Sequence, residues 1–186
     1  MNLYAGSDAI ELDNYYDDWE GQPTHILSYG YAEHKLGWYV GEEDLYLHID
    51  MDTKGGQLFG NTPLTITTED GQQVQFHIQV NRESGTVEVY NYSDWQGPLI
   101  TTDGRIMTAE DEEGKPYERT EFRIPLGAIS QEGEHRGMEA QIEIPTLGSQ
   151  VVIIQGVSSG PLISVLLMGG IGVLGFLGYQ KKRKEA

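Results

Sequence analysis

A run of alternating residues between Tyr46 and Asp52 carries the side chains best suited to chemistry. In the stretch DLYLHIDMD, Tyr46, His48, Asp50 and Asp52 share one face of a predicted strand, and neighbours on such a face lie roughly 6–7 Å apart. An imidazole and two carboxylates at that spacing could bind zinc or a hard cation. Polar residues are also the ordinary occupants of a solvated strand face, so a purely structural role stays open.

Three acidic residues near the start of the chain, Asp13, Asp17 and Asp18, form a second candidate metal site. Calcium binds clustered carboxylate and carbonyl oxygens supplied by loops, so these residues could hold a structural Ca2+. The sequence does not have the spacing of an EF-hand loop. Exposed acids in turns are the alternative interpretation.

Aromatic residues offer a third kind of chemistry, the stacking of rings on sugars. Trp95, in the stretch NYSDWQGP, directly precedes a predicted turn, and Tyr90 and Tyr92 come just before it. We regard these three residues as candidate ligand-stacking side chains. Trp19 follows two aspartates beside a predicted strand, and we expect it to fill the core.

Motifs of common catalytic centres are absent from the sequence. It contains no HExxH, nucleophile elbow or phosphate-binding loop. It also lacks cysteine, which excludes thiol nucleophiles, thiolate metal sites and disulfides. We therefore expect no enzymatic activity and no certain cofactor. A haem would need an axial histidine or methionine pair, and the chain offers the residue types without diagnostic spacing: His25, His34, His48, His77, His135, Met51, Met107 and Met138.

The elements that must position these residues are strands. In VQFHIQV, for example, Val74, Phe76 and Ile78 alternate with polar residues, as a half-buried strand requires. Similar runs recur up to QVVIIQG, and a short helical turn is expected at PLGAIS. Turn signals separate them, among them 69–71, 83–85, 102–104 and 113–116. This pattern predicts an all-β domain over residues 1–157, an antiparallel β-sandwich of jelly-roll or immunoglobulin-like type.

The end of the chain is predicted to be a membrane anchor. After a junction at 158–160, residues 161–180 carry no charge, and about 20 apolar residues span a bilayer. The basic residues that follow predict a stop-transfer signal in a cytoplasmic tail, 181–186, with the domain extracellular: Lys181, Lys182, Arg183 and Lys184. The opening MNLYAGSDAIELD does not resemble a signal peptide, so either the start is truncated or processed, or the protein is tail-anchored with its domain in the cytoplasm. We favour the first, because the second would move four cations across the membrane. The net charge of −17 disfavours nucleic acid as a partner.

Several stretches resemble known families. IELDNYYDDWEGQP, DLYLHIDMD and TEFRIPLGAI resemble signature segments of family 9 carbohydrate-binding modules and DOMON domains, although Asn14 replaces a usual glycine. The closing region is similar to the Firmicu-CTERM sorting domains of Gram-positive bacteria. Their pattern implies a sorting junction before the span, made here by Gly156, Ser158, Ser159, Gly160 and Pro161. The first resemblance also implies a β-sandwich and slightly favours a structural calcium ion.

We therefore expect a single-pass surface protein of a bacterial cell membrane whose domain binds or presents rather than catalyses. Expected partners are the lipid bilayer, a cell-wall glycan or another surface protein, and an intramembrane protease that processes the glycine-rich span. The alternative is a DOMON-like redox domain that binds haem or a metal.

Overall fold

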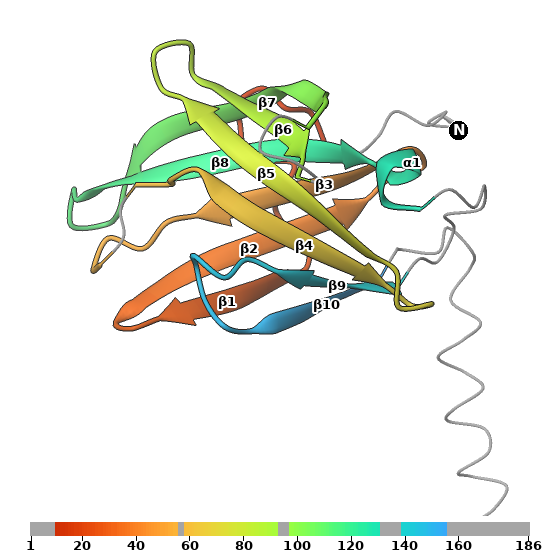
Figure 1. Ribbon diagram of the computed structural model, residues 1–186. Coiled ribbons are helices and arrows are strands. Elements are labelled where there is room, and N and C mark those ends of the chain that lie inside the picture. Colours follow the sequence, from red (N-terminus) through yellow and green to blue (C-terminus); the bar gives the residue numbers. More distant parts are fainter. Residues whose placement is uncertain (1–9, 56–57, 93–96, 131–138, 156–186) are drawn as a thin grey trace, which may run out of the picture.

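The computed structural model describes residues 10–55, 58–92, 97–130 and 139–155, and in this part the chain is almost entirely β-structure (Figure 1). The strands are β1 (Thr24–Tyr29), β2 (Ala32–Val40), β3 (Asp44–Asp50), β4 (Thr62–Thr68), β5 (Gln73–Asn81), β6 (Thr86–Asn91), β7 (Leu99–Glu110), β8 (Pro116–Pro125), β9 (Glu139–Glu143) and β10 (Val151–Gln155). The helical turn expected at PLGAIS is confirmed as α1 (Leu126–Ile129).

All strand pairs are antiparallel, so the predicted all-β antiparallel class is confirmed. The two separate sheets of a sandwich are not what these residues form, because the strands follow one another in one continuous sheet. Its order is β1-β2-β3-β8-β7-β6-β5-β4-β9-β10, and the sheet curls until it nearly closes as a barrel (Figure 1). Its inner face encloses one core, to which distant strands contribute fully buried side chains such as Leu36, Leu47, Ile66, Phe76 and Phe122.

The turn predicted at 102–104 is wrong, because these residues lie inside β7. There β7 has extra residues opposite β6, with register shifts on both sides of Val89, and such bulges increase strand twist. A Cβ on Gly104 would come within 2.8 Å of the Val87 Cβ and 2.9 Å of the Phe122 Cβ. Glycine is therefore required at this position by close packing across β6, β7 and β8 rather than by a turn.

The two edge strands, β1 and β10, meet at the seam of the barrel. The side chain of Gln150, the residue before β10, hydrogen bonds to β1: its Oε1 accepts a hydrogen bond from the Ser28 backbone N–H at 3.1 Å, and its Nε2 donates to the Ser28 carbonyl at 3.4 Å. One carboxamide thus supplies the donor and the acceptor that a neighbouring strand would offer to Ser28.

The antiparallel order sorts the connections between two ends of the barrel. The turns at 30–31, 51–55, 82–85 and 111–115 lie at one end, which we call the tyrosine end (Figure 1). β10 runs away from this end and finishes at Gln155. The sorting junction, the predicted span 161–180 and the basic tail lie outside the described residues. Among the residues that the structure describes, no helix is long and apolar enough to cross a membrane.

Candidate functional site

The outer face of β4 and β5 is uncharged and rich in carboxamide and hydroxyl groups, whereas the uncharged edge strands β1 and β10 expose the apolar Ile26, Val151 and Ile153. Strand alternation points the residues between the core positions outward, and the same two strands bury Leu64, Ile66, Phe76 and Ile78. The outward residues are Pro63, Thr65, Thr67, Gln73, Gln75, His77 and Gln79. Since the whole chain holds 29 aspartates and glutamates, this amide and hydroxyl surface is a distinct patch, which we call the amide face.

Strand register orders the amide face into rows. Thr65 lies opposite Gln75, Thr67 lies opposite Gln73, and Pro63 lies opposite His77. Facing pairs on an antiparallel sheet have Cβ atoms about 4.5–5.5 Å apart, so hydroxyl and carboxamide groups alternate at close intervals. The neighbouring strand β9 extends the rows with Gln141 and Glu143.

Aromatic side chains border the amide face along β6. The His77 ring stacks on Tyr92, with centroids 5.7 Å apart and planes at 27°. Tyr90 lies opposite His77, and its hydroxyl donates a 2.6 Å hydrogen bond to Glu88, which raises the pKa of the Tyr90 phenol. Two of the three predicted stacking residues are therefore next to the amide face. The third, Trp95, lies outside the described residues.

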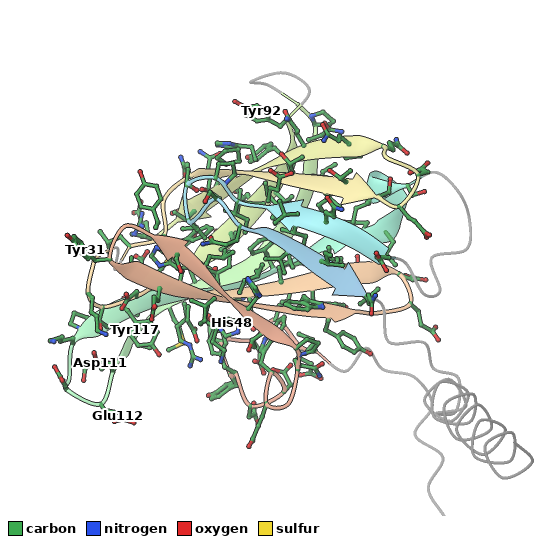
Figure 2. All side chains as sticks on the ribbon, turned by 90° about the horizontal axis from the view of Figure 1, so that it is seen from below. Tyr31, His48, Tyr92, Asp111, Glu112 and Tyr117 are labelled. Atoms are coloured by element: carbon green, nitrogen blue, oxygen red, sulfur yellow. The ribbon has the colours of Figure 1, made fainter. Side chains whose placement is uncertain are left out.

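The predicted His48 site is on a different side of the barrel, as Figure 2 shows for His48 and Tyr92. His48 does point away from the barrel core, but it is only 2% exposed because residues 10–23, the N-terminal strap, cover it. The ring centroids of Tyr16 and Trp19 lie 4.9 and 5.1 Å from that of His48. The solvated strand face expected here is thus a second, smaller core, which sequence alternation alone could not reveal.

Asp50 lies beneath the strap, where its carboxylate contacts the side chains of His48 and Arg119. His48 Nε2 lies 2.7 Å from its Oδ1, and Arg119 Nε donates to the same oxygen at 2.6 Å. Burial would raise the pKa of Asp50, but these partners outweigh it and lower the pKa to about 2. The Arg119 guanidinium also lies 4.2 Å from the centre of the Tyr16 ring, a cation–π contact.

Three of the predicted metal ligands accept hydrogen bonds from backbone N–H groups. Asp52 lies beyond the end of β3 and accepts the N–H groups of Glu33 and Lys54 at 2.8 and 3.0 Å. Asp13 Oδ1 accepts the Tyr15 N–H at 2.8 Å, and Asp18 Oδ2 accepts the Glu11 N–H at 2.7 Å. Among the described residues, no group of three histidines or acids is arranged to hold a metal ion.

Asp13, Asp17 and Asp18 all lie in the N-terminal strap. Burial raises the pKa of Asp18, and the nearby charges of Asp13 and Asp17 raise it further. Asp17 contributes its carbonyl oxygen to a turn, accepting the Glu20 N–H at 3.2 Å. The structure brings the three predicted calcium ligands into one short segment, where the calcium ion remains a proposal.

Glu121 is the residue that sequence reasoning missed. It is completely buried, its Oε1 accepts the Asn14 N–H at 2.7 Å and its Oε2 accepts the Trp19 indole N–H at 3.2 Å. Burial raises its pKa to about 7, and the charges of Asp18 and Asp13 add to the shift. Alternation within TEFRIPL places Glu121 on the outer face beside Arg119 and Arg123, a signal that could have identified it.

The histidines considered as haem ligands lie in different surroundings. His34 and His48 are buried, and His34 Nδ1 accepts the Asp52 N–H at 3.1 Å. His25 is exposed on β1 and His77 is stacked on Tyr92. His135 and Met138 lie outside the described residues.

Comparisons with known proteins add little to this geometry. No family model matches the chain, and no curated protein matches it. The crystal structure of a Bacteroides uniformis protein, provisionally described as carbohydrate-binding, aligns with 78% of this chain and 83% of its own at 12% identity and a TM-score of 0.38. A TM-score this low does not show a shared fold. The family resemblances drawn from the sequence therefore remain predictions.

Proposed function

We propose that this domain is a non-catalytic glycan-binding module whose ligand lies on the amide face. The observation that carries the proposal is the outer surface of β4 and β5, where carboxamides, hydroxyls and one imidazole form an uncharged polar surface in an acidic chain. Carboxamides both donate and accept hydrogen bonds, so they match sugar hydroxyl groups, which do the same.

The aromatic border supplies the apolar half of sugar recognition. A binding site normally combines aromatic surface with a few polar groups that fix orientation. Stacking on His77 restricts the Tyr92 ring, and the bond to Glu88 restricts the Tyr90 hydroxyl, so these side chains lose less freedom when a ligand binds.

The negative charge of the chain limits the type of glycan that it could bind. A chain with a net charge of −17 repels polyanions, which disfavours phosphate-rich and uronate-rich polymers. Glu88 and Glu143, at the two sides of the amide face, strengthen this effect. A neutral or amino-bearing wall glycan fits the surface best.

Glycan arrays test the proposal with the variants Gln75→Ala and Gln79→Ala combined, and with Tyr92→Ala. Both glutamines are exposed, so we expect these variants to fold like the parent chain. Loss of two hydrogen bonds should weaken binding of a neutral glycan roughly tenfold or more, at ~1 kcal/mol each. Gln155→Ala, an exposed glutamine on β10, is the matched control. The proposal is contradicted if both amide-face variants bind glycan like the parent chain, or if the parent chain binds no glycan.

The domain is further proposed to be held at a Gram-positive cell membrane by residues 161–180, with Gly156 to Pro161 as a sorting junction and Lys181 to Lys184 retained in the cytoplasm. The support is the uncharged length of this segment and the cations after it. Membrane fractionation tests this topology, and addition of a protease to intact cells should degrade the domain. Recovery of the full-length chain in the soluble fraction contradicts it.

A further inference from the structure

Large side chains with apolar surface are exposed in the connections of the tyrosine end. Tyr31 is 96% exposed in the two-residue turn between β1 and β2, Tyr29 beside it is 61% exposed, and Leu58 after β3 is 67% exposed. Gly30 provides the left-handed conformation of this turn, with φ of 63°. The Tyr31 ring therefore contributes nothing to the core, and turn formation does not call for an aromatic residue at its position.

The connections of the tyrosine end are tied to one another by carboxylates. Asp52 accepts the Glu33 N–H and so joins the β1–β2 hairpin to the 51–55 connection. The side chain of Thr53 in turn hydrogen bonds Asp111 of the β7–β8 turn. Asp111 also accepts the N–H groups of Glu113 and Lys115 at 2.9 and 2.8 Å. The exposed tyrosines thus project from a surface that is ordered before any partner arrives.

The charge of this end is negative. Glu33, Glu110 and Glu112 have exposed side chains, and Figure 2 shows Tyr31, Asp111 and Glu112 at the same end of the barrel. Of the local cations, Lys115 pairs with Glu113 at 2.7 Å and Arg82 with Glu118 at 2.6 Å. Lys54 is exposed, and acids outnumber cations in these connections. Exposed aromatic rings and exposed carboxylates therefore occur at the same end of the barrel.

We propose that the tyrosine end docks an arginine- and lysine-rich segment of another protein. Guanidinium and ammonium groups bind both to the faces of tyrosine rings and to carboxylates, so one type of partner satisfies both features. Aromatic residues are also the usual energetic centres of protein interfaces, and pre-organisation lowers the entropic cost of binding. The inference is independent of the glycan proposal, because the amide face is the outer face of β4 and β5 and shares no residue with the tyrosine end.

The position of this end suits such contact. β10 runs away from the tyrosine end and ends at Gln155, from which the chain continues to the predicted span. With the anchor proposed at residues 161–180, the chain would leave the barrel at the end opposite the tyrosine end.

Fluorescence anisotropy of labelled octa-arginine with the full-length chain in detergent micelles tests the proposal. At about 150 mM salt, charges more than roughly 8 Å apart are largely screened, which suppresses unspecific attraction. We expect Tyr29→Ser combined with Tyr31→Ser to weaken binding roughly fivefold, the factor that cation–π contacts at exposed sites imply. Glu33→Gln combined with Glu112→Gln should also weaken it.

Two matched controls keep the test decisive. Tyr15→Ser removes another exposed tyrosine, which is located in the N-terminal strap, and Glu42→Gln combined with Glu43→Gln removes two exposed acids at the β2–β3 turn. Both should bind octa-arginine like the parent chain. The proposal is overturned if the double tyrosine variant keeps its affinity, or if the Glu42 and Glu43 variant loses as much as the Glu33 and Glu112 variant. None of these variants alters the amide face, so a negative result leaves the glycan assay unaffected.

Discussion

The indole N–H of Trp19 donates a hydrogen bond to Glu121, a carboxylate that is fully buried on the outer side of β8. Because Glu121 also accepts the Asn14 N–H, one side chain joins the N-terminal strap to the barrel at two points. The remaining contacts of the strap with this face include the packing of Ile10 and Trp19 on Tyr46. Glu121 is therefore the carboxylate that accepts both of these hydrogen bonds from the strap.

Trp19→Phe should destabilise the domain by about 1–3 kcal/mol, because the ring is largely kept while a buried carboxylate loses a donor. Urea unfolding at neutral pH measures this change. Trp38→Phe is the matched control: Trp38 packs against the main core, but its indole nitrogen has no hydrogen-bond partner within the described part of the chain. Equal losses in the two variants would show that ring size alone matters and that the bond to Glu121 contributes nothing.

Titration of Glu121 should make stability fall as pH rises from about 4.5 to 7. Its pKa is raised from 4.5 in the unfolded chain to about 7 in the fold, so over this range the unfolded chain releases a proton that the folded one keeps. The full effect is on the order of 3 kcal/mol, and it is absent below the unfolded pKa. Unfolding free energies at several pH values, compared with those of Glu121→Gln, measure it.

Asp50 provides an internal contrast to Glu121. Its pKa is lowered from 3.8 to about 2, so its contribution is present above pH 3.8 and disappears as pH falls toward 2. The two groups thus act in separate pH windows. A Glu121→Gln variant that kept the loss of stability between pH 4.5 and 7 would contradict the assignment to Glu121.

Asn14→Gly should leave the domain as stable or more stable by about 1 kcal/mol, whereas Asn14→Ala should destabilise it. Asn14 has φ of 69°, a left-handed conformation that glycine adopts without strain and alanine does not. Its buried side-chain oxygen also lacks a hydrogen-bond partner among the described residues, so little is lost with the side chain. Thermal melts of the two variants measure the difference, and an Ala variant at least as stable as the Gly variant contradicts the expectation.

Alternation of apolar residues predicted much of the fold but not the contacts across it. It identified strands such as β3, β5 and β8 because apolar residues recur at every second position of their sequences, although β3 is buried on both faces. It could not show that the sheet curls into a near-barrel, since the bulges of β7 and the hydrogen bond between Gln150 and Ser28 involve residues that are distant in sequence. The same limit applied to His48: sequence gives the face on which it lies, while its burial depends on a strap from 30 residues earlier.

The candidate site was predicted only at its aromatic edge. Tyr90 and Tyr92 were recognised from their proximity to Trp95 and a turn, a local signal. The amide face went unnoticed because threonine and glutamine in strands are ordinary residues individually. The continuous polar surface can be recognised only once the strand register is known, which places Thr65 beside Gln75 and Pro63 beside His77.

Gln150→Met should open the seam of the barrel locally without unfolding it. The substitution keeps side-chain length but removes both hydrogen bonds to the Ser28 backbone, so the Ser28 N–H loses its protein partner at that edge. Because Ser28 is exposed, water replaces part of the lost bonding, and the cost should be only about 1 kcal/mol. Amide hydrogen exchange should accelerate at Ser28 and remain unchanged in β5. Gln155→Met removes a carboxamide that bonds Glu139 on β9 instead, and it should leave Ser28 exchange as in the parent chain. If both variants behave alike, the edge strands are held together by their packing, and the carboxamide of Gln150 does not close the barrel.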